Sequence, residues 1–60
     1  MSRYRVRILD ADSERSWYVT DSFGLALSPD RAARFKRDIA LAVADMFEIA
    51  ERRWRASLEL

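Results

Sequence analysis

The sequence predicts an α+β fold in which a short antiparallel two- or three-stranded meander precedes one long C-terminal helix. Three observations support this prediction: strict alternation near the N-terminus, a helix-capping sequence at Ser28, and no Gly or Pro after Pro29. The expected strands span about residues 3–9, 16–20 and 24–27, and the helix spans about 29–55. These elements form a single domain, residues 1–60.

The alternation from Arg3 to Ile8 is the clearest strand pattern, because successive side chains of a strand point to opposite faces. One side carries Arg3, Arg5 and Arg7, and the other carries Tyr4, Val6 and Ile8. Residues 17–20 are aromatic or β-branched and suit a second strand, with the polar segment 10–15 as the connection. The segment Asp21–Gly24 is typical of a turn, and residues 25–27 complete a short third strand.

The helix prediction begins at Ser28, which suits an N-cap, and at Pro29, which suits the first helical position. A helix over residues 29–54 is about 39 Å long, whereas a seven-residue strand reaches only about 23 Å. Its apolar arc covers roughly half the circumference, more than the roughly 100° that one sheet contact needs. The helix should therefore extend beyond its own sheet and expose apolar side chains.

This exposed part predicts a protein interface. The interface residues are Met46, Phe47, Ile49, Ala50 and Trp54. The expected core consists of Val6, Ile8, Val19, Leu25, Leu27, Phe35, Ile39, Val43 and Met46. Two alternatives leave this helix face covered within one chain: a sheet that curls around it, or a tail at 57–60 that folds back.

The charge pattern of the helix suggests a homodimer. Basic residues come first (Arg31, Arg34, Lys36, Arg37) and acidic residues follow (Asp45, Glu48, Glu51). Two antiparallel copies place opposite charges side by side, which suits a two-fold contact. The other interpretation is a different protein partner on the same apolar face.

Size and composition also favour association. A 60-residue chain buries only about 60% of its unfolded surface, and it has neither Cys nor His for disulfides or zinc. The missing His and Cys, and a single Gly, predict no enzyme, no cofactor, no metal site and no small-molecule substrate. Asp10, Asp12 and Glu14 are spaced for weak cation binding, but a solvated turn is the favoured interpretation.

The arginine side of the first strand is the second candidate site. Arg3, Arg5 and Arg7, with Tyr18 as a stacking surface, suit contact with nucleic acid or an acidic partner. A net charge of +1 provides no global attraction for nucleic acid. A solvated or salt-bridged outer sheet face is the favoured alternative.

No apolar run reaches the roughly 20 residues of a membrane span, and the chain begins without the apolar stretch of a signal peptide. We therefore expect a cytoplasmic protein that does not contact membranes. The stretch from Leu25 to Phe35 resembles a pattern common in short bacterial and phage proteins, in which a brief strand ends in Leu-Ser-Pro-acid and leads into an Ala/Arg-rich helix. By analogy with small accessory and phage-encoded regulators, the expected function is a non-enzymatic regulatory or interaction module.

Overall fold

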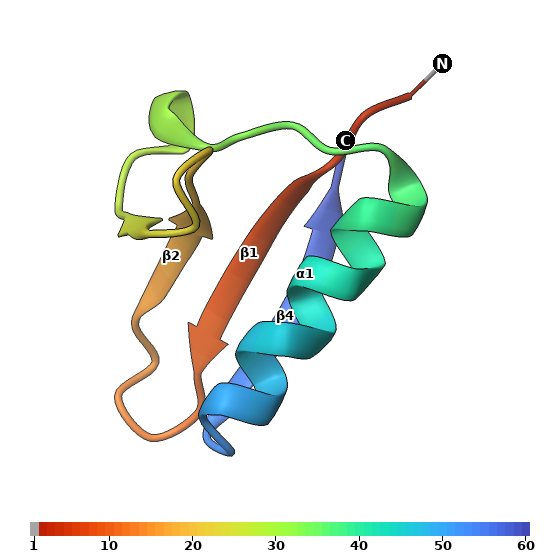
Figure 1. Ribbon diagram of the computed structural model, residues 1–60. Coiled ribbons are helices and arrows are strands. Elements are labelled where there is room, and N and C mark those ends of the chain that lie inside the picture. Colours follow the sequence, from red (N-terminus) through yellow and green to blue (C-terminus); the bar gives the residue numbers. More distant parts are fainter. Residues whose placement is uncertain (1) are drawn as a thin grey trace.

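A computed structural model describes residues 2–60 and shows an α+β fold with one sheet and one α-helix (Figure 1). The elements in chain order are β1 (Arg5–Asp10), β2 (Ser16–Val19), β3 (Leu25–Ala26), the 3₁₀ turn η1 (Pro29–Arg31), α1 (Arg37–Ala50) and β4 (Trp54–Glu59). The four strands are antiparallel and lie in the order β3-β2-β1-β4. Helix α1 packs on one face of this sheet (Figure 1).

The alternation in β1 separates two environments, as the period of a strand requires. Val6 and Ile8 are completely buried beneath α1, while the side chains of Arg5 and Arg7 lie on the other face. In the β1–β2 hairpin, Ile8 stands opposite Trp17 and Arg7 opposite Tyr18.

The prediction of a helix from residue 29 to 55 is wrong. Ser28 does cap a helical turn, since its hydroxyl accepts a hydrogen bond from the Asp30 amide, but this turn ends at Arg31. Ala32 is extended, with φ −68° and ψ 131°, and the chain then crosses one end of the sheet. Phe35 exchanges two backbone hydrogen bonds with Tyr4, of 2.8 and 2.9 Å. These tertiary contacts override the local helix propensity of residues 32–36.

The predicted C-terminal end of the helix is also wrong. Helix α1 ends at Ala50, and a turn returns the chain as β4, which pairs with β1 along its whole length. The signal is visible in the sequence, because apolar Trp54, Ala56 and Leu58 alternate with polar Arg55, Ser57 and Glu59. This alternation was not interpreted as a strand, because no Gly or Pro separates it from the preceding helix. The helix ends before Glu51 instead, because the Glu51 carboxylate accepts hydrogen bonds from the backbone amide and the guanidinium of Arg53 and so stabilises a turn.

The fully buried core is small and lies between α1 and the sheet. It consists of Val6, Ile8, Val19, Ala40, Val43 and Ala44. Of the other residues expected in the core, Leu25 and Phe35 are half-buried, whereas Leu27, Ile39 and Met46 are 75, 48 and 49% exposed.

The helix does not extend beyond its sheet. Its 14 residues span about 21 Å, and the six residues of β1 span about 20 Å. The predicted excess length of the helix was therefore a consequence of the wrong element boundaries.

Candidate protein-interaction site

The sheet is too wide for its helix. Four strands at about 4.8 Å spacing form a surface about 19 Å across, while a helix with its side chains covers about 10 Å. Helix α1 packs chiefly on β4 and β1. The β2–β3 half of the same face lies beside α1 rather than under it (Figure 1), although Val19 of β2 is completely buried.

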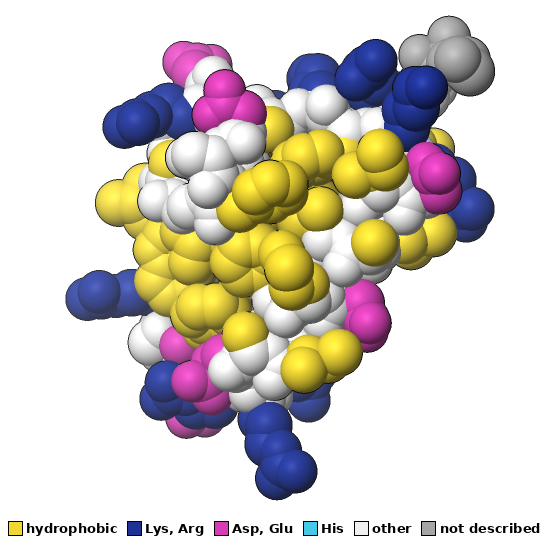
Figure 2. All heavy atoms as spheres, viewed as in Figure 1, with side chains coloured by type: hydrophobic (Ala, Val, Ile, Leu, Met, Phe, Trp, Pro, Cys, Tyr) yellow, Lys and Arg dark blue, Asp and Glu magenta, His cyan; other side chains and the backbone are white. Residues whose placement is uncertain are grey.

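An apolar hollow lies between α1 and Phe23, which belongs to the turn that joins β2 to β3. Its volume is about 630 Å³, and its lining consists of Phe23, Asp38, Ile39, Ala42, Val43 and Met46. We call these residues the apolar groove. Figure 2 shows that hydrophobic side chains gather over α1 and the neighbouring part of the sheet, with charged side chains at the margins.

Three large side chains of the groove are about half exposed. Phe23, Ile39 and Met46 keep 53, 48 and 49% of their surface accessible. Helix α1 explains this, since Arg37, Asp38, Asp45 and Glu48 are its only polar residues. A helix that is apolar over most of its circumference is normally covered on more than one side.

Phe23 is held in a backbone conformation that bulky residues rarely adopt. Its φ of 62° lies in the left-handed region, where a side chain such as Phe is strained. The turn is fixed by Thr20, whose hydroxyl accepts a hydrogen bond from the Gly24 amide and whose carbonyl accepts one from the Phe23 amide. The ring of Phe23 stacks on Phe35 with centroids 6.2 Å apart. Strain of this kind is often concentrated at functional positions.

The predicted interface residues separate into two groups. Met46, Ile49 and Ala50 are exposed, and Ile49 retains 74% of its surface. Phe47 and Trp54, expected as interface anchors, instead pack in the chain's own core. Trp54 lies between Trp17 and Phe47, with ring centroids at 5.9 and 6.2 Å. The return of β4 places Trp54 under the helix rather than at its exposed end.

Arg5, Arg7 and Tyr18, predicted as a second site, do share the open face of the sheet. Glu59 of β4 lies among them, at 3.6 Å from Arg5 and 3.7 Å from Arg7, and accepts a hydrogen bond from the Tyr18 hydroxyl. The Arg5 guanidinium lies 5.5 Å from the centre of the Tyr18 ring. Arg3 precedes β1, is exposed and is not part of this cluster.

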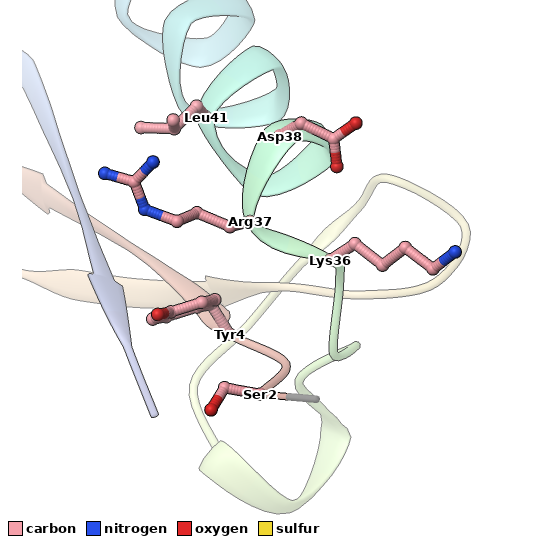
Figure 3. A pocket seen from close by; sticks show the side chains of 6 residues that line it. All are labelled: Ser2, Tyr4, Lys36, Arg37, Asp38 and Leu41. Atoms are coloured by element: carbon pink, nitrogen blue, oxygen red, sulfur yellow. The ribbon is translucent and has the colours of Figure 1, made fainter.

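A second hollow of about 540 Å³ lies at the start of α1. Figure 3 shows Lys36 and Asp38 projecting to one side of the helix start and Arg37 and Leu41 to the other, with Tyr4 and Ser2 below. Lys36 is the N-cap residue and makes no side-chain capping bond, and Asp38 provides the negative charge that favours a helix N-terminus.

The acidic loop after β1 is a hydrogen-bonded turn. The carboxylate of Asp10 accepts bonds from the amides of Asp12 and Ser13, at 2.9 and 3.2 Å, and these bonds lower its pKa, the Asp12 amide most. Asp12 pairs with Arg53 at 3.8 Å. Within residues 2–60, no group of three or more acidic side chains is arranged to hold a metal ion.

Sequence reasoning missed Phe23 as a site residue. The available signal was a large aromatic side chain at the third position of the predicted turn Asp21–Gly24, where small or polar residues are usual. Ile39 was assigned to the core because its helical phase matches Val43, and only the position of α1 on the sheet places it at an open margin.

Comparison with protein-family models finds no match to this chain, and neither do comparisons with curated proteins and with solved structures. Among the helices of residues 2–60, none has the length and apolar character to cross a membrane.

Proposed function

We propose that this chain is a non-enzymatic protein-interaction module that binds through the apolar groove and completes its core there, either by self-association or with a partner protein. The main support is the open apolar flank of α1: Phe23, Ile39 and Met46 keep about half of their surface accessible around a hollow of about 630 Å³. Exposed apolar surfaces of this kind mark interaction sites. A regulatory role, by analogy with small accessory proteins, and the cytoplasmic location stay predictions.

Phe23 adds a second line of support. A strained backbone costs about 1–3 kcal/mol, and here it holds an aromatic ring that is 53% exposed. The ring stacks on Phe35 and still leaves about half of the side chain accessible to a partner. An aromatic side chain held rigidly at the margin of an apolar groove is the type of residue that often dominates binding energy.

The test compares the same charge substitution at two partly exposed apolar residues on opposite faces of the molecule. Met46→Lys places a charge in the groove, and Leu9→Lys, at 41% exposure on the open sheet face, is the matched control. Sedimentation of the purified chain across a micromolar concentration series, and affinity capture from the source cells, should show association that Met46→Lys removes and Leu9→Lys preserves. Equal loss in both variants, or no association of any kind in the wild type, contradicts the proposal.

Phe23→Asn separates binding from stability. Asn tolerates the left-handed conformation better than Phe does, so the substitution relieves backbone strain while removing the ring. We expect a stability close to that of the wild type and at least a tenfold weaker association. Association that survives Phe23→Asn excludes Phe23 from the interface.

A second candidate function is nucleic-acid binding by the open face of the sheet. One observation favours it: Arg5, Arg7 and Arg55 share this face with a single carboxylate, Glu59. Phosphate binding weakens steeply with ionic strength, whereas binding in an apolar groove changes little. Affinity for a single-stranded oligonucleotide, measured at 50 and 200 mM salt with wild type and with Arg7→Gln, distinguishes the two functions.

A further inference from the structure

The shape of the apolar groove specifies the kind of partner it accepts. Along α1, Ile39, Ala42 and Met46 recur at the spacing of one helix face. Ala42, the small residue at the centre of this row, permits another helix axis to approach closely. An extended peptide needs free strand edges instead, and this groove is a surface of side chains.

The charges at the margin select among helices. Asp38 lines the groove, Asp45 lies two turns further along the same flank of α1, and Asp21 lies in the turn that presents Phe23. All three carboxylates are exposed, and none forms an ion pair with another residue of the described chain. Lys36 projects to the same side of the helix start as Asp38 (Figure 3) but is not among the residues that line the groove. The one charged residue among those that line the groove, Asp38, is therefore acidic.

The chain's own helix is a poor occupant for this margin. In an antiparallel two-fold pair, the identical flanks of the two helices face each other. Asp38 and Asp45 of one copy then lie against Asp38 and Asp45 of the other, so that like charges meet. The oppositely charged blocks expected in the homodimer are also partly engaged elsewhere. Glu48 accepts a hydrogen bond of 2.8 Å from the Ala56 amide, and Glu51 pairs with Arg53 at 3.2 Å.

We infer that the apolar groove takes an amphipathic helix of another protein, with apolar anchors along one face and Lys or Arg along its flanks. This inference rests on the proposed function and adds the chemistry of the partner. The partner helix lies along the flank of α1, contacts Phe23 and Met46 with its apolar face, and pairs its basic flank with Asp38 and Asp45. Helix-in-groove recognition combined with charge complementarity supplies both affinity and partner choice.

The experiment is a selection from displayed helical peptides whose apolar face is fixed and whose flank positions are each Lys or Glu. Against the wild-type chain we expect about a tenfold enrichment of Lys over Glu, because two exposed ion pairs replace two like-charge contacts. Against the double variant Asp38→Lys/Asp45→Lys the preference should reverse. Asp45→Lys alone, at a position where the side chain makes no hydrogen bond or ion pair within residues 2–60, should give an intermediate preference.

Controls keep this inference separate from the proposed function. Leu9→Lys should leave the selection unchanged. If peptides bind through Met46 but without charge preference, or if a synthetic peptide of residues 37–50 binds more tightly than the Lys peptides, the basic-helix inference is overturned and the interaction module stands. If no selected peptide depends on Met46, both are overturned.

Discussion

The two halves of the helix-facing sheet surface differ in how they are closed. Over β1 and β4, helix α1 buries Val6 and Ile8 completely, and Trp54 packs between two other aromatic rings. Over β2 and β3, burial depends on the connecting segment, whose Phe35 packs against the core. Phe23 and Met46 stay about half exposed there.

This difference shows that width, not length, limits how well the chain covers its own core. Helix and strand match in length, so the covered half is closed from end to end. Within the described residues 2–60, α1 is the single α-helix, and β2 and β3 depend on connecting segments for their cover. The open half is therefore the part of the fold that we propose another molecule completes.

The largest expected effect comes from cavity formation in the covered half. Ile8 is fully buried, so Ile8→Ala should lower the free energy of unfolding by about 3 kcal/mol. Met46→Ala, the counterpart in the open half, should cost less than about 1 kcal/mol. Urea denaturation monitored by tryptophan fluorescence measures both values. Similar losses in the two variants show that the two halves are equally closed.

A smaller effect is expected at the aromatic cluster. Trp54→Ala removes the ring that contacts both Trp17 and Phe47, and it should cost about 2 kcal/mol because Trp54 is only half-buried. Ile49→Ala, at 74% exposure, should change stability by less than about 0.5 kcal/mol. Circular dichroism melting curves provide the comparison, and an unchanged melting temperature in Trp54→Ala contradicts the placement of Trp54 in the core.

Next in size is the link between α1 and the edge of the sheet. The Glu48 carboxylate accepts a hydrogen bond from the Ala56 amide, which points away from β1. Glu48→Ala should cost about 1 kcal/mol and leave an unpaired amide on the β4 edge, where another chain's strand adds easily. Glu48→Gln keeps an acceptor and is the control. Light scattering on concentrated samples should increase with the Ala variant only.

The smallest expected effect is a pH dependence from the acidic turn. Hydrogen bonds from the Asp12 and Ser13 amides lower the folded-state pKa of Asp10, and hydrogen bonds from Arg53 lower that of Glu51. Because a lowered folded pKa favours the charged form in the folded state, the stability is present above the ordinary carboxyl pKa of about 4 and is lost as the pH falls through and below it.

The measurement is a set of urea denaturation curves between pH 7 and pH 2. Asp10→Asn should flatten the acid limb relative to the wild type, and Asp21→Asn, at an exposed site, should leave it unchanged. If Asp10→Asn loses stability at acid pH as the wild type does, other carboxylates cause the pH dependence.

The local patterns of the sequence were read correctly where neighbours in the chain decide the outcome. The alternation at Val6 and Ile8 places these residues on the buried face, and Ser28 caps a helical turn where the capping pattern indicates one. The second strand and the turn after it follow from residue types that suit them. Such features depend on steric and hydrogen-bonding preferences within a few residues.

The same patterns gave wrong boundaries for the helix and omitted β4. Residues 32–36 have no local reason to avoid a helix, and they become extended because Phe35 pairs with Tyr4 across the sheet. The same error affected the candidate site. Ile49 is exposed, whereas Met46, which was assigned to both the core and the interface, is about half exposed. Phe47 and Trp54, expected at the interface, pack against the core, and Phe23 was not among the expected site residues.

The sequence by itself determined that a chain this short and this apolar leaves part of its apolar surface exposed, because composition and length set that balance. Only the tertiary structure decided where the surplus lies. Pairing of β4 with β1 creates a sheet four strands wide, and the position of α1 over one half leaves the groove beside it. Contacts between residues distant in sequence, which no local pattern encodes, fix that position.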